Sequence, residues 1–182
     1  MLKIMSVIVA QDYNRILKIH GGMMFVSWFI LPIIGIYVAR YLRKLNWFPI
    51  HLSLMILTLL FTVASFILIV LHRPYPHFSS FDKINNAHTK IGLTVFILLI
   101  VQVILGSIAH VFRVNPLTLT NKIHKILGKL LVMLAIINVI IGLYVYSSFD
   151  SISTGYFISI YILLGVIIFT FITTEIIIKK SQ

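Results

Sequence analysis

Acidic residues and cysteine are what this chain most lacks. Only 4 of its 182 residues are Asp or Glu, and none is cysteine. So few carboxylates cannot solvate the surface of a globular domain, in which charged residues make up roughly 25% of the sequence. The absence of thiols excludes disulfides, iron–sulfur clusters, thiolate-ligated metals and covalently attached haem. Any metal cofactor must therefore be held by histidine, methionine or oxygen ligands.

Apolar residues dominate the rest of the chain. Hydrophobic residues make up 60% of it, charged residues 10%, and the mean hydropathy is +1.07. A helix that crosses a bilayer needs about 20 apolar residues, and five such runs occur, at residues 16–42, 49–71, 86–112, 120–147 and 154–178. No stretch remains for a soluble domain. We therefore expect one all-α integral membrane domain over residues 1–182, an up-down four-helix bundle with a fifth, peripheral helix.

The 15 Lys and Arg residues, which dominate a net charge of +11, lie at the ends of these runs. Cations at such positions contact lipid headgroups, which leaves no basic surface for nucleic acid. Five spans place the two ends of the chain on opposite sides of the membrane, called here side A (N-terminal) and side B (C-terminal). Side B carries more of the basic residues, so the positive-inside bias predicts a cytoplasmic C-terminus and a non-cytoplasmic N-terminus.

Each of the first four predicted spans carries a histidine near its N-terminal end: His20, His51, His88 and His124. Because consecutive spans run in opposite directions, His20 and His88 lie near side A, and the other two lie near side B. Alternate helices of an up-down bundle are diagonal partners. Each pair therefore meets across the core at one depth, as the two axial ligands of a b-type haem do. A lone histidine near a helix end usually just sits among headgroups, but this matched arrangement predicts two haem b groups.

The third and fourth spans repeat one pattern after these histidines. Glycine follows at offset 4, an amide at 14 and glycine at 18: His88 with Gly92, Gln102 and Gly106, and His124 with Gly128, Asn138 and Gly142. These offsets are near multiples of the helical turn, so all members share the histidine face. The glycine at offset 4 leaves room for a porphyrin edge or for a close helix contact. The amide lies ~21 Å further along the axis, which puts Gln102 at the depth of the side-B haem and Asn138 at that of the side-A haem.

Two groups of polar residues are weaker candidates for substrate binding. The side-A group comprises His72, Arg73 and His77, which could bind a metal ion or an anionic electron partner. The side-B group comprises Arg40, Lys44 and Lys125, which could gather an anionic small-molecule reductant. Both groups are also explained by contact with headgroups at the membrane interface. His110, near the side-B end of the third span, is interpreted as an interfacial residue.

A series of short matches to a known family runs from about His20 to Leu143. In order they are His20-Gly21 with Met24 and Trp28, Pro32, Gly35, Ala39-Arg40-Tyr41, Trp47-Phe48 before His51, and the two His-x-x-x-Gly units. Together they resemble the cytochrome b561 family. The resemblance implies a diheme transmembrane oxidoreductase with the four histidines as ligands. It also implies a cytoplasmic donor, often ascorbate, and an acceptor such as monodehydroascorbate or ferric iron on the other side.

The sequence resembles the five-span form of this family, which elsewhere follows an extracellular haem-binding DOMON module, but without that module. The acceptor on side A is therefore left open between a small molecule, a metal ion and a redox protein. An alternative function is a haem-bearing membrane anchor of a larger respiratory or reductase complex. A structural subunit without haem fits less well, because all four ligands are present. Whether the chain acts alone, as a homodimer or as a complex subunit is also left open.

Overall fold

The computed structural model describes residues 2–44, 46–72, 83–111 and 119–147, and scattered helical positions between 158 and 176. By its internal contacts the chain divides into two compact units, Met1–Tyr146 and Ser147–Gln182. The first unit holds every described residue of the predicted sites. In the second unit, Thr170 and Thr174 donate to main-chain oxygens four residues earlier, as helical threonines do. Most of the fifth predicted span, 154–178, lies outside the described residues.

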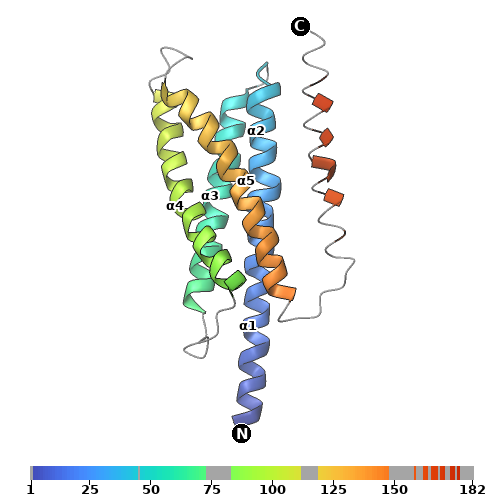
Figure 1. Ribbon diagram of the computed structural model, residues 1–182. Coiled ribbons are helices and arrows are strands. Elements are labelled where there is room, and N and C mark those ends of the chain that lie inside the picture. Colours follow the sequence, from blue (N-terminus) through green and yellow to red (C-terminus); the bar gives the residue numbers. More distant parts are fainter. Residues whose placement is uncertain are drawn as a thin grey trace. The chain divides into compact units, whose positions relative to one another are not determined.

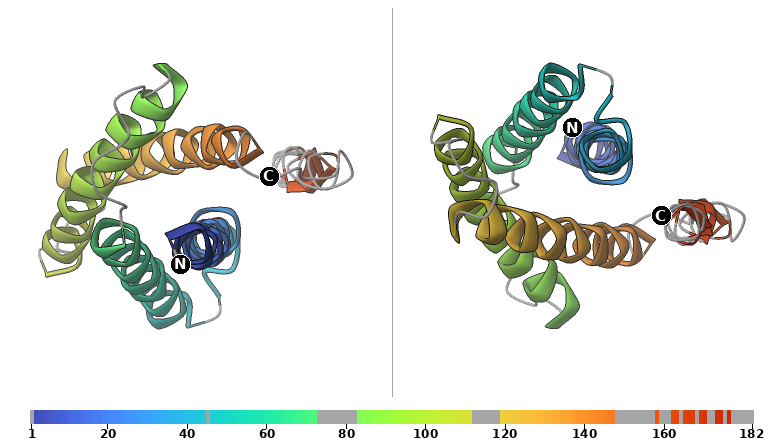
Figure 2. Two further views of the ribbon diagram at one scale, coloured as in Figure 1. Left: turned by 90° about the horizontal axis from the view of Figure 1, so that it is seen from below. Right: turned by 90° about the horizontal axis from the view of Figure 1, so that it is seen from above.

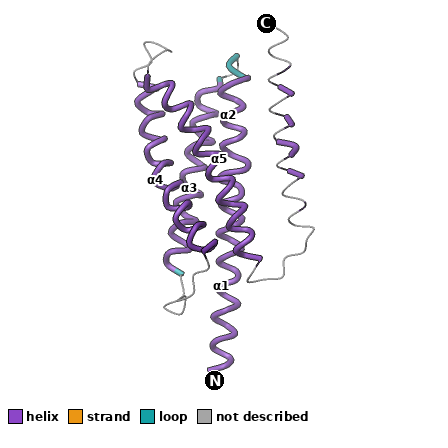
Figure 3. Tube along the Cα trace, in the orientation of Figure 1, coloured by secondary structure: helices purple, strands orange, loops and turns teal. Residues whose placement is uncertain are grey.

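The described secondary structure is entirely helical (Figure 3). The elements are α1 (Leu2–Phe25), a π-helical turn η1 (Val26–Ile30), α2 (Leu31–Tyr41), α3 (Trp47–Leu71), α4 (Lys83–Val111) and α5 (Leu119–Ser147). The turn η1 joins α1 and α2 into one helical segment that continues in a single direction (Figure 1). This segment, α3, α4 and α5 alternate in direction, which confirms the predicted up-down order for the first four spans.

Four helical segments are long and apolar enough to cross a membrane: Asp12–Tyr41, Trp47–Leu71, Ala87–Val111 and Leu119–Ser147. They agree with the first four predicted spans to within a few residues. Large apolar side chains such as Leu60, Ile97 and Ile126 are more than half exposed on their outer faces. Such surfaces suit contact with lipid, and the helical hydrogen bonds satisfy the backbone there.

Helix α3 packs against α1 and α2 through a face of small polar side chains, and Figure 2 shows these helices side by side. Thr58, Thr62 and Ser65 follow one another at helical spacing and are at most 2% exposed. Ser27 of η1 is also fully buried. Small residues allow helix backbones to approach closely where lipid provides no hydrophobic drive for association.

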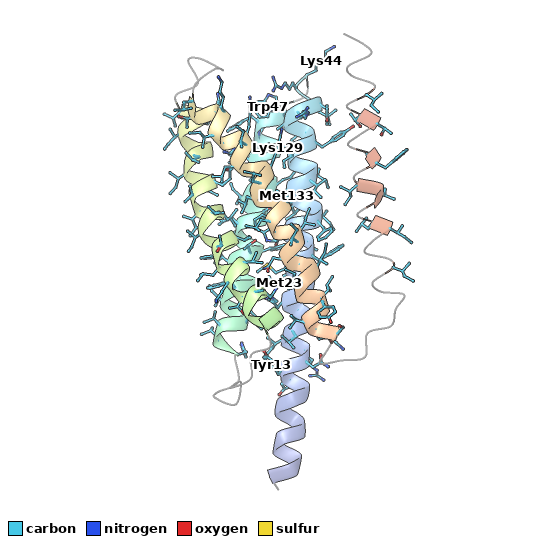
Figure 4. All side chains as sticks on the ribbon, viewed as in Figure 1. Tyr13, Met23, Lys44, Trp47, Lys129 and Met133 are labelled. Carbon is cyan, nitrogen blue, oxygen red and sulfur yellow. The ribbon has the colours of Figure 1, made fainter. Side chains whose placement is uncertain are left out.

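Two side-chain contacts join helices at opposite ends of the first unit. At side A, the Tyr146 hydroxyl at the end of α5 donates to Asn14 Oδ1 of α1 at 2.7 Å. At side B, the rings of Phe48 and His110 stack with centroids 3.8 Å apart, joining the start of α3 to the end of α4. Figure 4 places Tyr13 toward the first of these ends and Trp47 toward the second.

Candidate functional site

His20 of α1 and His88 of α4 face each other at side A. Their ring centroids are 6.4 Å apart, and the ring planes are nearly perpendicular, at 88°. Two imidazoles that bind one metal ion through bonds of ~2 Å hold their ring centres about 6 Å apart. The spacing of this pair therefore fits one metal ion between the rings.

His51 of α3 and His124 of α5 form the second pair, at side B. Both residues are partly buried. Among the described residues, no three His, Asp or Glu side chains gather as a metal-binding group. Each histidine pair would supply two protein ligands, as a six-coordinate b-type haem requires.

The Nδ1 atoms of the histidines point at the main chain of the adjacent antiparallel helix. Three of them donate to a main-chain oxygen: His20 to Ser65 at 3.2 Å, His88 to Asn138 at 3.1 Å and His51 to Gly35 at 2.9 Å. Nδ1 of His124 faces the main-chain oxygen of Gln102 without reaching hydrogen-bond geometry. A hydrogen bond at Nδ1 fixes the tautomer and leaves Nε2 for a metal ion. The donor set therefore fits axial ligation of haem.

The amides of Gln102 and Asn138 lie beside the histidines whose depths they were predicted to share. Gln102 Nε2 donates to the main-chain oxygen of His124 at 2.8 Å. The Asn138 amide, turned with its nitrogen toward His88, donates to that residue's main-chain oxygen at 2.9 Å and accepts from the Gly92 N–H at 3.3 Å. Each amide thus ties together two antiparallel helices at the level of one histidine.

Ser65 plays the corresponding part in the first half of the bundle. Its hydroxyl donates to the main-chain oxygen of His20 at 3.2 Å and lies 2.9 Å from the Nδ1 atom of the same residue. Ser65 follows His51 at offset 14, like Gln102 and Asn138 in their helices. Hydrogen bonds of the same kind therefore join α1 to α3 and α4 to α5, although the sequence repeat is weak in α1 and α3.

The glycines at offset 4 accommodate these amides. A Cβ atom on Gly92 would lie 3.1 Å from the side-chain amide of Asn138, and one on Gly128 would lie 2.6 Å from Gln102 Nε2. A side chain at either position would push the amide away from its partner. These contacts agree with one of the two predicted roles for these glycines, the close helix contact; room for a porphyrin edge stays a prediction.

The glycines at offset 18 accommodate the histidine rings themselves. A Cβ atom on Gly142 would lie 2.6 Å from His88 Cε1, and one on Gly106 would lie 2.9 Å from His124 Cε1. The offsets placed these glycines on the histidine face but did not predict that they touch the ring of the neighbouring helix. Gly106 and Gly142 are therefore further candidate site residues. Gly35 is another, because its main-chain oxygen accepts from His51.

The predicted substrate-binding groups are less organised. In the side-B group Arg40, Lys44 and Lys125 are all exposed, and the Arg40 guanidinium lies 5.5 Å from the centre of the Tyr41 ring. In the side-A group His72 is exposed and bonds only to Leu68 of its own helix among the contacts described. Arg73 and His77 lie outside the described residues. His110 is exposed and stacked on Phe48, at side B as predicted.

Comparison with known proteins agrees with the helical pattern. The family described as eukaryotic cytochrome b561 matches residues 17–150. A Xenopus laevis protein named "Putative ferric-chelate reductase 1" is 36% identical over 57% of this chain and 18% of its own length. Ferric-chelate reductase 1 of Mus musculus is 32% identical over 52% of this chain and 17% of its own length. A cytochrome b561 and DOMON domain-containing protein of Arabidopsis thaliana is 28% identical over 83% of this chain and 40% of its own length.

This chain thus spans less than half of the length of each of these relatives. No solved structure matches it. The family match covers well over half of the chain and includes all four histidines, and the family implies a b-type haem cofactor. The chain is therefore a multi-pass membrane protein that belongs to the cytochrome b561 family.

Proposed function

We propose that this chain transfers electrons across a membrane with two b-type haems. His20 and His88 would hold one haem near side A, and His51 and His124 would hold the other near side B. A reductant would be oxidised on side B and an acceptor reduced on side A. The observation that carries the proposal is the presence of two histidine pairs toward opposite ends of one helical bundle, with rings oriented by hydrogen bonds from adjacent helices.

The chain's own residues would bind, orient and enclose each cofactor. A bound b-type haem supplies a reversible one-electron couple. The main-chain oxygens of Ser65, Asn138 and Gly35 hold Nδ1 of three of the histidines, which leaves Nε2 available to bind the iron. Apolar side chains such as Phe29 and Leu131, at most 3% exposed, exclude water from the bundle interior. A dry interior and oriented ligands are the means by which a protein tunes the potential of a haem.

The exposed cations at side B favour an anionic donor. Lys125 directly follows the proposed ligand His124, and Arg40 and Lys44 lie at the same end of the bundle. Such groups bind a carboxylate or enolate by charge-assisted hydrogen bonds, so ascorbate is a suitable donor. The larger share of basic residues on side B favours a cytoplasmic location for it.

The proposed acceptor on side A rests on the names of the relatives. Several carry the name ferric-chelate reductase, which suggests ferric iron in a chelate. Monodehydroascorbate and a redox partner protein are the other candidates.

The first test is the haem content of the purified chain. A pyridine haemochrome assay should find two b haems per chain, both six-coordinate and low-spin in the spectrum. Proteoliposomes that hold ascorbate inside should then reduce a ferric chelate outside, and protein-free vesicles should not. One haem per chain would instead favour the anchor-subunit alternative. A folded chain without haem would refute the proposal.

A further inference from the structure

The segment between His20 and Gly35 contains the π-helical turn η1. The N–H of Leu31 bonds to the oxygen of Val26, five residues earlier, where an α-helix would bond four residues earlier. Pro32 follows within the first turn of α2. The described parts of α3, α4 and α5 contain no such turn. Such π turns are rare and often lie at functional sites.

The residues that present a main-chain oxygen to a histidine occupy a regular place in their helices. Three of them lie 14 residues after the histidine of their own helix: Ser65 after His51, Gln102 after His88 and Asn138 after His124. Gly35, which accepts from Nδ1 of His51, lies 15 residues after His20. The helix with the extra residue is the helix with the π turn.

The π turn compensates for this extra residue. In an uninterrupted α-helix one more residue would rotate Gly35 by about 100° and carry its oxygen away from α3. A turn closed by an i→i+5 bond contains about one residue more than one closed by an i→i+4 bond. Fifteen residues that include one π turn therefore make nearly the same number of turns as fourteen α-helical residues.

Pro32 explains why the turn forms at this point. Proline has no N–H to donate, and in a regular helix its ring would clash with the oxygen four residues earlier, that of Trp28. A wider turn immediately before Pro32 relieves this clash. Pro32 is fully buried, as are Trp28 and Phe29 of the π turn, so packing holds the wider turn in place.

We propose that η1 is a register correction that brings the oxygen of Gly35 onto Nδ1 of His51. The lack of a side chain at Gly35 is part of the same arrangement, because a Cβ atom there would meet the end of Met55 and lie 3.5 Å from Nδ1 of His51. Gly35 and η1 act as positioning elements, and their importance rests on the proposed role of His51 as a haem ligand. The oxygen of Gly35 belongs to the main chain, so its position depends on the register of the helix and not on which side chains the helix carries.

A deletion provides the first test. Ile30 is an exposed member of η1, and removing it together with the change Pro32→Ala should yield an uninterrupted α-helix with the 14-residue spacing of α3, α4 and α5. The register of Gly35 should then be unchanged. Inserting one Ala after Ile30 should instead rotate Gly35 away from α3. The matched control is deletion of Ile97, an exposed residue of α4 between His88 and Gln102, where no π turn can absorb the change.

Cysteine cross-linking measures the position of Gly35 relative to α3 and does not depend on the cofactor. A Cβ atom on Gly35 would lie 3.5 Å from Leu54 Cβ, within the range of a disulfide, and the chain has no cysteine of its own. In chains that also carry Met55→Ala, which makes room for the new Cβ atom, the pair Gly35→Cys/Leu54→Cys should cross-link with the parent sequence and with the Ile30 deletion and Pro32→Ala. It should fall to background in the chain with the inserted Ala. Equal cross-linking in all three, or loss of it in the deletion chain, would overturn the inference.

Haem content, measured without the cysteine changes, provides the second readout. The deletion chain should keep the parent's haem content, whereas the inserted Ala should weaken retention of the side-B haem about 10–100-fold, the usual effect of losing a partner of a ligating histidine. The Ile97 deletion should also lose haem. If the Ile30 deletion were as harmful as the Ile97 deletion, the register correction would be wrong. If the parent bound no haem but the cross-linking pattern held, the register inference would stand and the proposed function would fail.

Discussion

Nδ1 of His88 lies 3.1 Å from the main-chain oxygen of Asn138, in a hydrogen bond that joins α4 to α5. The same relation joins His20 of α1 to Ser65 of α3. Each of these histidines is oriented by the helix beside it and meets its partner ring from another helix. In each helix the orienting residue lies ~21 Å along the axis from that helix's own histidine. In the proposed arrangement, every helix would therefore provide a ligand to one site and a positioning group to the other.

Replacing His88 with Ala should reduce the haem content from two per chain to one. The reason is that His20 alone would leave the proposed side-A haem with only one protein ligand. The pyridine haemochrome assay measures the content, and the spectrum identifies the haem that remains. His110→Ala is the matched control, because His110 lies on the same helix but stacks on Phe48 at side B, and it should keep both haems. Loss of the same haem from His88→Ala and His124→Ala would refute the pairing.

The change Asn138→Leu should weaken the side-A site and leave the side-B site nearly unchanged. The shape of Asn138 is roughly kept, but its bonds to His88 and Gly92 are lost. Loss of such a supporting group typically costs about 10–100-fold in metal affinity. Haem titration of each site by absorbance measures the effect. Gln102→Leu is the reciprocal change and should weaken the side-B site; equal effects of either change on both haems would contradict the assignment.

The change Gly142→Ala should displace His88 and lower the haem content at side A. The new Cβ atom would lie 2.6 Å from His88 Cε1, which is closer than real Cβ contacts, so the ring must move. Haem content and the low-spin spectrum report the displacement. Gly22→Ala is the control: nothing lies within 4 Å of its Cβ position, and alanine should stabilise an exposed helical site by about 0.5–1 kcal/mol. Equal loss of haem in both variants would show that the contact with His88 is not the cause.

The double change Lys44→Gln/Lys125→Gln should slow reduction by ascorbate several-fold at low salt. Both side chains are exposed at side B, and removing two cations weakens the attraction of an anionic donor. The difference should shrink above 0.1 M salt, where exposed charges more than about 10 Å apart are screened. Stopped-flow reduction at several ionic strengths measures it. Lys90→Gln, an exposed cation on side A, should have no effect on this rate.

The membrane class, the first four spans and the positions of the four histidines near the helix ends follow from the sequence alone. The length of an apolar run is visible in the sequence itself. In a bilayer such a run forms a helix, because backbone groups in lipid must bond within their own segment. Histidine pairing follows almost as directly, because consecutive spans alternate in direction. The offset of 14 residues was enough to place Gln102 and Asn138 at the depths where the structure has them.

Only the tertiary structure decided which atoms meet. The contacts of Gly106 and Gly142 with histidine rings depend on how closely two helices approach, and no spacing within one helix encodes that distance. The π turn before Pro32 is a similar case. Proline predicts an interruption of the helix, but a kink, a break and a π turn would all relieve it. The π turn forms where packing against α3 keeps Gly35 opposite His51, because the register of a helix is settled by the neighbour it must contact.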